Sequence, residues 1–215
     1  MKIKYEKNPD TIYKQSFSIV REETDFSQFN EKEAILATRI VHACGIPEVA
    51  SNLRFSDGAI DAGIAALSEG PNVICDCNMV KAGISISTKL IQCKVQCFLE
   101  HPTVLSIAKA EKTTRSAAQV EVWKDFLSGS IVVIGNAPTA LFRLLEEIQE
   151  GAAKPAIVIG FPVGFVGASE SKKLLNELRP LVPHATILGR LGGSAMAAAA
   201  FNALVQLADR SINYE

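Results

Sequence analysis

The sequence lacks the features of a membrane, secreted or nucleic-acid-binding protein. Nowhere do about 18 consecutive apolar residues occur, and the first 17 residues, MKIKYEKNPDTIYKQSF, are polar where a signal peptide needs an apolar stretch. The 22 basic and 23 acidic residues are interspersed and leave a net charge of -1. Because there is no basic stripe, we expect a cytoplasmic protein with no nucleic-acid or membrane partner, in which local groups hold any anionic ligand.

Metal ligands are also scarce. The chain has three histidines and five cysteines, and no two cysteines have the CxxC spacing of a structural zinc site. A reducing compartment would keep an odd set of cysteines as thiols. We therefore predict no protein-bound metal, and we interpret Cys44 as a packing residue. The five cysteines are Cys44, Cys75, Cys77, Cys93 and Cys97.

The apolar and charged fractions, 48% and 21%, are typical of a globular chain, and we expect residues 1–215 to form a single domain. Short β-rich runs are separated for the most part by helical stretches of about ten or more residues. This alternation predicts an α/β fold: a doubly wound, mainly parallel sheet with helices on both faces, in the flavodoxin-like three-layer α/β/α arrangement. The predicted strands are residues 73–75, 94–99, 131–134, 156–159 and 185–188.

One helix is predicted in detail, over residues 31–44. Asn30 and Glu33 have the spacing of a capping box, and Gly45 with Pro47 supplies a stop. Its predicted buried stripe consists of Ala34, Ala37, Val41 and Cys44.

Three glycine-containing loops follow predicted strands, at residues 135–138, 160–167 and 189–194. Pro138 is predicted to begin the next helix, and Ser194 to cap the last one. One such loop alone indicates only a turn, but three at the carboxyl edge of one sheet favour a broad anionic ligand, since free N–H groups at helix starts attract anions. Neither the GxGxxG fingerprint in its βαβ context nor the Walker pattern is present, which disfavours a nucleotide.

His42 and Arg39 are the residues that indicate proton transfer. They lie three positions apart and share one face of the predicted helix. The helix C-terminus favours the imidazolium and the guanidinium opposes it, so the sequence leaves open which effect dominates the pKa of His42. A pKa near neutrality would suit an acid or base. The alternative is a histidine that is merely hydrogen-bonded at a helix edge.

Arg115 stands at a predicted helix start, after Thr113 and Thr114. A cation there opposes the helix dipole, and a ligand carboxylate would resolve that conflict. The alternative is an arginine that reaches solvent or a local acid such as Glu111.

Six motifs stand in an order that resembles the precorrin-8X methylmutase family, and the resemblance runs from about Tyr5 to about Leu204. The motifs are Tyr13-x2-Ser-Phe17, Arg39-Ile-Val-His-Ala-Cys-Gly45, Thr114-Arg-Ser-Ala117, Gly135-Asn-Ala-Pro-Thr-Ala140, Pro162-Val-Gly-Phe-Val-Gly167 and Gly189-Arg-Leu-Gly-Gly-Ser-Ala-Met196.

The resemblance implies an isomerase of corrin biosynthesis. A methyl group would move from C-11 to C-12 of ring C of precorrin-8 or cobalt-precorrin-8, giving hydrogenobyrinate or cobyrinate. No redox change and no cofactor would be needed, and any cobalt would be carried by the substrate. The resemblance also implies that His42 is the proton donor and acceptor at the ring C nitrogen in a sigmatropic shift, that Ser16 and Arg39 contact the substrate, and that the chain forms a homodimer with the active site near the interface.

Further substrate-binding residues are predicted from the loops and the helix start. Arg115 and Arg190, with glycine-rich amides, would take the peripheral carboxylates of the tetrapyrrole as charge-assisted hydrogen bonds. A non-catalytic tetrapyrrole carrier is the competing interpretation, because it needs the same contacts but not the proton-transfer residue. The residues predicted in this way are Arg115, Asn136, Gly164, Arg190, Gly192, Gly193 and Ser194.

Overall fold

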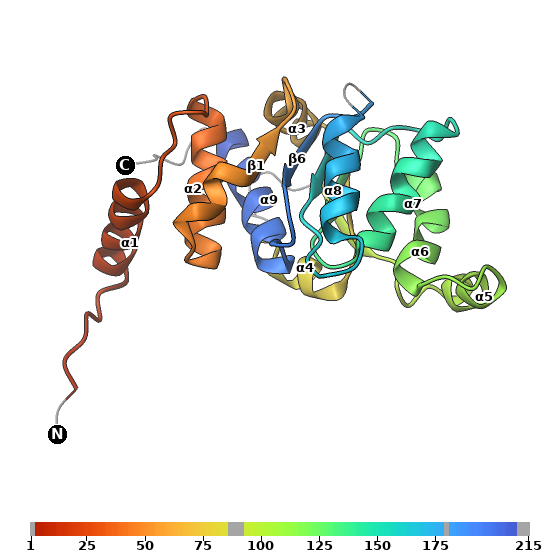
Figure 1. Cartoon of the computed structure of the whole chain (residues 1–215), viewed down its shortest axis with the longest axis horizontal. Helices are drawn as coiled ribbons and strands as arrows, with labels where there is room; N and C mark the ends of the chain where they lie inside the picture. The colour runs from red at the N-terminus through yellow and green to blue at the C-terminus, as the bar shows by residue number, and fades with distance from the viewer. Residues whose placement is uncertain (1–2, 86–92, 179–180, 210–215) are drawn as a thin grey trace.

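The computed structural model describes residues 3–85, 93–178 and 181–209. Within these ranges, six strands form one sheet in the order β1-β6-β5-β4-β2-β3 (Figure 1). β1 is antiparallel to β6, and every other neighbouring pair is parallel. The strands are β1 (Leu53–Phe55), β2 (Asn72–Cys75), β3 (Lys94–Cys97), β4 (Ile131–Ile134), β5 (Ile157–Gly160) and β6 (His184–Ile187).

Helices cover both faces of the sheet, and a separate apolar cluster lies on each side. In β4, Ile131 and Val133 belong to one cluster, while Val132 and Ile134 belong to the other. Both faces of the sheet are buried under helices, which explains why the central strands are continuous apolar runs. The predicted three-layer α/β/α class is confirmed. One side carries α2 (Glu31–Cys44), α3 (Ala59–Ser68), α4 (Asn78–Gly83) and α9 (Ser194–Ala208), and the other carries α6 (Arg115–Trp123), α7 (Pro138–Gln149) and α8 (Ala168–Glu177).

The remaining helices lie outside these two layers. α5 (Pro102–Ala110) packs on α6, and α1 (Pro9–Glu23) packs on α2 and stands away from the body in Figure 1. Two short 3-10 helices, η1 (Pro47–Asn52) and η2 (Lys124–Phe126), complete the chain's helical elements in the described ranges. No described helix is long and apolar enough to cross a membrane.

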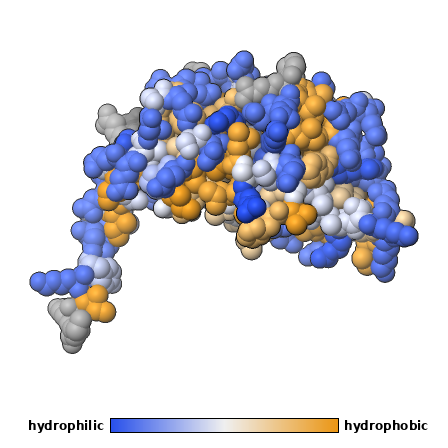
Figure 2. All heavy atoms as spheres, viewed as in Figure 1, coloured by the Kyte–Doolittle hydropathy of each residue, from blue (hydrophilic) through white to orange (hydrophobic). Residues whose placement is uncertain are grey.

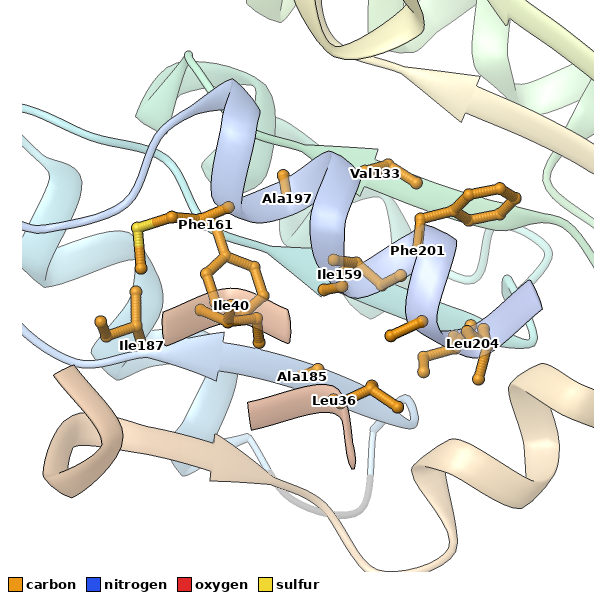
Figure 3. Packing of buried hydrophobic residues seen from close by; sticks show 14 of the residues in the cluster. Leu36, Ile40, Val133, Ile159, Phe161, Ala185, Ile187, Ala197, Phe201 and Leu204 are labelled. Carbon is orange, nitrogen blue, oxygen red and sulfur yellow. The ribbon is translucent and has the colours of Figure 1, made fainter. Parts of the chain in front are cut away.

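The packing of α2 on α9 fixes the end of the molecule that carries His42 (Figure 3). The predicted capping box of Asn30 and Glu33 is present, and Gly45 ends α2 in the left-handed region at φ 67°. The predicted buried stripe was partly wrong, because Ala34 and Cys44 are only half-buried. Leu36 and Ile40 are fully buried instead, since the alanine-rich face of α9 leaves room for larger side chains.

Two predicted helix starts have different outcomes. Pro138 is the first residue of α7, as predicted. Ser194 is not a cap: Gly193 holds that position, and Ser194 is the first helical residue, with its Oγ 3.5 Å from Cys77 Sγ. The periodicity also missed α1, although Asn8 followed by Pro9 is a helix-start signal. It missed β1 as well, because three residues are too few to show an alternating pattern.

Candidate functional site

The predicted site residues fall into two groups on one side of the molecule. β4, β5 and β6 are neighbours and parallel, so the three glycine-containing loops leave from one edge of the sheet, on the lower side in Figure 1. The C-terminal end of α2, which carries His42, points to the same side. Ligands of open α/β sheets collect beyond this edge. No hydrogen bond joins the two groups within the described residues.

The first group surrounds the His42 ring. Its Nδ1 lies 3.0 Å from the Oγ of Ser16 on α1, and the ring stacks on Phe17 with centroids 4.5 Å apart. The Arg39 guanidinium lies 4.6 Å from the centre of the Phe17 ring and 5.2 Å from that of Tyr13. The structure therefore brings Ser16, Arg39 and His42 together, as the resemblance implied. The ring is fixed by stacking on one face and by Ser16 at one nitrogen.

The question that the sequence left open for His42 has an answer in this geometry. Partial burial lowers the pKa of His42, and the positive charge of Arg39 lowers it further. Both effects act against the helix dipole. In the free protein this environment therefore favours the neutral imidazole of His42.

Replacing Arg39 with glutamine is expected to raise the pKa of His42, because one of the two causes of its depression is removed. The midpoint of the His42 ring in an NMR titration should lie below 6.5 in the wild type and move upward in Arg39→Gln. Lys173→Gln is the control, since it removes one exposed positive charge from α8. A midpoint that stays in place in Arg39→Gln, or moves equally in the control, would contradict this account.

A cavity of about 200 Å³ adjoins His42, between α1 and the end of α2. It is small beside the roughly 300–1,000 Å³ of typical ligand pockets. A large ligand therefore has to extend beyond it. The cavity is lined by Ser16, Ile19, Val20, Glu23, Val41, His42, Gly45 and Pro47.

The second group, which we call the loop platform, consists of the loops at residues 160–167 and 189–194, and hydrogen bonds join the two. Gly193 N–H donates to the Phe161 carbonyl at 2.8 Å, and Gly164 N–H donates to the Arg190 carbonyl at 3.2 Å. A Cβ on Gly192 would clash with the Phe161 carbonyl oxygen and lie 2.8 Å from that of Pro162, so the backbones touch there. The loops that follow β5 and β6 thus form one surface.

Gly192→Ala is expected to destabilise the protein, because the new Cβ meets backbone that cannot rotate away. We expect the free energy of unfolding to fall by about 1–3 kcal/mol more than in Gly189→Ala. Gly189 is the matched control: it also has a positive φ, of 86°, but a Cβ added there would have no atom within 4 Å. Urea denaturation of the two variants measures this difference in the free energy of unfolding, provided that their m-values are equal. Equal losses in the two variants would show that the close approach has no role.

The N–H groups of the third loop, at residues 135–138, bind a side chain of the protein and not the anionic ligand that the sequence predicted. Asp76, which follows β2, accepts hydrogen bonds from the N–H groups of Gly135, Asn136 and Ala137. These amides are therefore already used by the protein, although the Asn136 side chain is exposed. The sequence analysis gave Asp76 no role, because the amides that it binds lie about sixty positions further along the chain.

The predicted arginines are exposed near these loops. Arg190 lies 5.4 Å from the centre of the Phe165 ring, which orients its guanidinium. Arg115 is the first residue of α6, and in the described part of the chain it forms no ion pair with Glu111 or any other acid. Both cations remain available to an anionic ligand.

A buried cation binds the backbone of the loop at residues 189–194. Lys172 on α8 is fully buried, and its Nζ donates to the Leu191 carbonyl. Burial lowers the pKa of Lys172 to about 8, so most of it is still protonated at neutral pH. Among the described residues no carboxylate pairs with it. Its charge therefore favours an anion at residues 189–194.

Large apolar side chains surround the same edge, and Figure 2 shows apolar atoms along this hollowed lower side. Phe165 and Val166 are 84% and 88% exposed, which is unusual for a monomer surface. The exposed apolar residues on α4 and these loops are Met79, Val163, Phe165, Val166 and Leu191.

The cysteines are free, and in the described ranges no three metal-binding side chains lie close enough together to hold an ion. Burial raises the pKa values of Cys44 and Cys75, which keeps them as thiols. Cys44 Sγ lies 3.5 Å from the Val41 carbonyl and 3.9 Å from that of Ile46, at the end of its own helix. This agrees with a packing role.

This edge of an α/β sheet, with a fixed histidine and exposed arginines beside it, has the groups that a site for a large anionic ligand needs. A profile of the precorrin-8X methylmutase family matches residues 11–207. The chain is 48% identical to precorrin-8X methylmutase of Pseudomonas aeruginosa over 94% of this chain and 97% of that protein. It is 43% identical to cobalt-precorrin-8 methylmutase of Methanocaldococcus jannaschii over 85% and 83%.

A solved structure of precorrin-8X methylmutase from Thermus thermophilus superimposes with a TM-score of 0.85 at 38% identity, covering 96% of this chain and 100% of that one. The chain belongs to the precorrin-8X methylmutase family, whose members are isomerases of cobalamin biosynthesis.

Proposed function

We propose that this chain moves the methyl group on C-11 of a precorrin-8, with or without cobalt in the macrocycle, to C-12 of ring C. The product is hydrogenobyrinate or cobyrinate. The observation that carries the proposal is the arrangement of Ser16, Arg39 and His42 at the end of α2, on the side of the glycine loops, in a member of this family. We place the protein in the cytoplasm.

His42 supplies the proton chemistry in this proposal. Because Ser16 contacts Nδ1, Nε2 is the nitrogen left for the ring C nitrogen of the substrate. Protonation there polarises the conjugated ring; the bond from C-11 to the methyl breaks as the bond to C-12 forms, and the proton returns to His42. Electrons are conserved within the macrocycle, so no organic cofactor is required. The anionic substrate offsets the charge of Arg39 and raises the pKa of His42 in the complex.

The other predicted residues bind the macrocycle. Arg39, Arg115 and Arg190 are the cations that meet its carboxylates. In the two linked loops the N–H groups of Gly164 and Gly193 already bind carbonyls of the protein, so the remaining N–H groups of these loops are the ones that donate to the macrocycle. The shared surface keeps the ring at a fixed distance from His42, which lowers the entropic part of the barrier. Besides Ser16 and the arginines, the proposed binding residues are Asn136, Gly164, Gly192, Gly193 and Ser194. Cobalt, when present, is held by the substrate's own nitrogens.

We further propose that the protein is a homodimer with the active site near the interface. Three observations support this: the small cavity beside His42, the exposed apolar residues at the same edge, and α1 standing away from the body (Figure 1). A second copy would enclose the ring and cover this apolar surface.

Incubation of the purified protein with precorrin-8 generated in situ tests the function. The account predicts a changed absorption spectrum together with an unchanged mass of the extracted tetrapyrrole, because an isomer forms. A spectrum that changes on binding, followed by extraction of unaltered substrate, would identify a carrier instead.

A further inference from the structure

Asp76 is a buried carboxylate that the proposed mechanism does not use. It follows β2 directly, and its side chain is fully buried. Oδ1 accepts the N–H of Gly135 at 2.9 Å, while Oδ2 accepts those of Asn136 at 2.9 Å and Ala137 at 2.7 Å. An isolated carboxylate is costly to bury, and these three donors compensate for that cost.

The three bonds hold the loop that immediately precedes α7. Ala137 precedes α7 and has no side-chain acceptor, and Pro138 lacks an N–H. Asp76, directly after the neighbouring strand, therefore fixes the backbone of the loop that leads into α7. Burial raises the pKa of Asp76, and the N–H groups together with the helix dipole oppose that rise.

Asp76 is itself held in place by a second buried side chain. Gln119 of α6 donates from Nε2 to the Asp76 carbonyl at 2.7 Å and accepts the Phe98 N–H at Oε1. Asp76 N–H donates to the Val133 carbonyl at 3.1 Å. Hydrogen bonds thus hold both the backbone N–H and the backbone carbonyl of Asp76, and this fixes the position from which its carboxylate reaches the loop.

The loop that Asp76 fixes is part of the candidate site. Asn136 is exposed between two amides that Asp76 binds. A Cβ on Gly135 would lie 2.7 Å from Ser194 Cα, so the loop also presses against the start of α9. The position of the Asn136 side chain therefore depends on the Asp76 carboxylate.

The same carboxylate decides what this loop can bind. Its N–H groups already bind the Asp76 carboxylate, which leaves none of the three for a substrate carboxylate. A substrate carboxylate is disfavoured there, whereas Arg190 and Lys172 favour one at the loop after β6.

We propose that Asp76 is a positioning residue: it holds Asn136 against an uncharged edge of the macrocycle and directs the substrate carboxylates to the neighbouring loops. This inference rests on the proposed isomerase function.

A double-mutant cycle tests whether Asp76 acts through Asn136. We expect Asp76→Asn and Asn136→Ala each to lower kcat on the order of ten- to a hundred-fold, and the double variant to be no worse than the worse single one. Asp125→Asn, at an exposed site in η2, is the control and should leave kcat unchanged. Multiplied losses in the double variant would show independent effects and overturn the proposal.

Chemical rescue gives a second readout. Asp76→Ala leaves three N–H groups around a space the size of a small carboxylate, so formate should restore turnover to this variant and chloride at equal ionic strength should not. Absence of any formate effect on a folded Asp76→Ala protein would contradict the assignment. If Asp76→Ala does not fold, the cycle with Asp76→Asn decides.

The outcomes separate this inference from the function. A wild type that converts no substrate refutes the proposed function. A wild type that converts substrate, with Asp76→Asn equally active, refutes only the role of Asp76.

Discussion

Replacing His42 with alanine is expected to abolish methyl migration while the fold and the loop platform stay intact. Loss of a positioned acid or base costs about 10²–10⁴-fold in rate. His42 lies on the exposed side of α2, and its ring contacts Phe17 and Ser16 of α1, which are outside the two apolar clusters that flank the sheet. The variant should therefore unfold near the wild-type temperature and still bind product. Single-turnover absorption kinetics measure the rate.

His101→Ala is the matched control. His101 is also an exposed histidine, but it lies at the start of α5, where its Nδ1 is 2.8 Å from Thr103 Oγ1. Its turnover should equal that of the wild type. Migration at the wild-type rate in His42→Ala would remove His42 from the mechanism.

Replacing Arg190 with alanine is expected to weaken product binding about ten- to a hundred-fold, the worth of one hydrogen bond to a charged group. Arg190 is exposed, and Phe165 orients its guanidinium at the edge where the loops meet. Because the proposal gives it a binding role, kcat at saturation should change much less than affinity. A spectroscopic titration with the tetrapyrrole product measures the dissociation constant.

Lys154→Ala controls for the loss of one exposed cation, since Lys154 precedes β5 and so lies at the opposite edge of the sheet. Its affinity should stay at the wild-type value. Unchanged affinity in Arg190→Ala combined with collapsed turnover would count against a binding role. The same comparison applies to Arg115.

The elements that local sequence determines were predicted well. The capping box at Asn30, the start of α7 at Pro138 and the apolar runs of β4 and β5 all depend on residues close together in the chain. Their alternation was sufficient for the three-layer class. The grouping of Ser16, Arg39 and His42 came from a resemblance, because spacing alone places only Arg39 and His42 on a common face.

Features that depend on distant residues were not visible in the sequence. Asp76 binds amides about sixty positions away, and no local pattern marks such a pair. The predicted role of the 135–138 amides therefore changed once the loop's occupant was known. The stripe of α2 was partly misplaced for a similar reason, since the small residues of α9 decide which side chains are buried.

Carbon-13 NMR of the product formed from precorrin-8 labelled at the methyl group on C-11 tests the central claim most directly. The account predicts that the labelled methyl is attached to C-12 after incubation with the wild type, and that it remains on C-11 with His42→Ala. A label that stays on C-11 with the wild-type protein, under conditions in which the tetrapyrrole is bound, would contradict the claim.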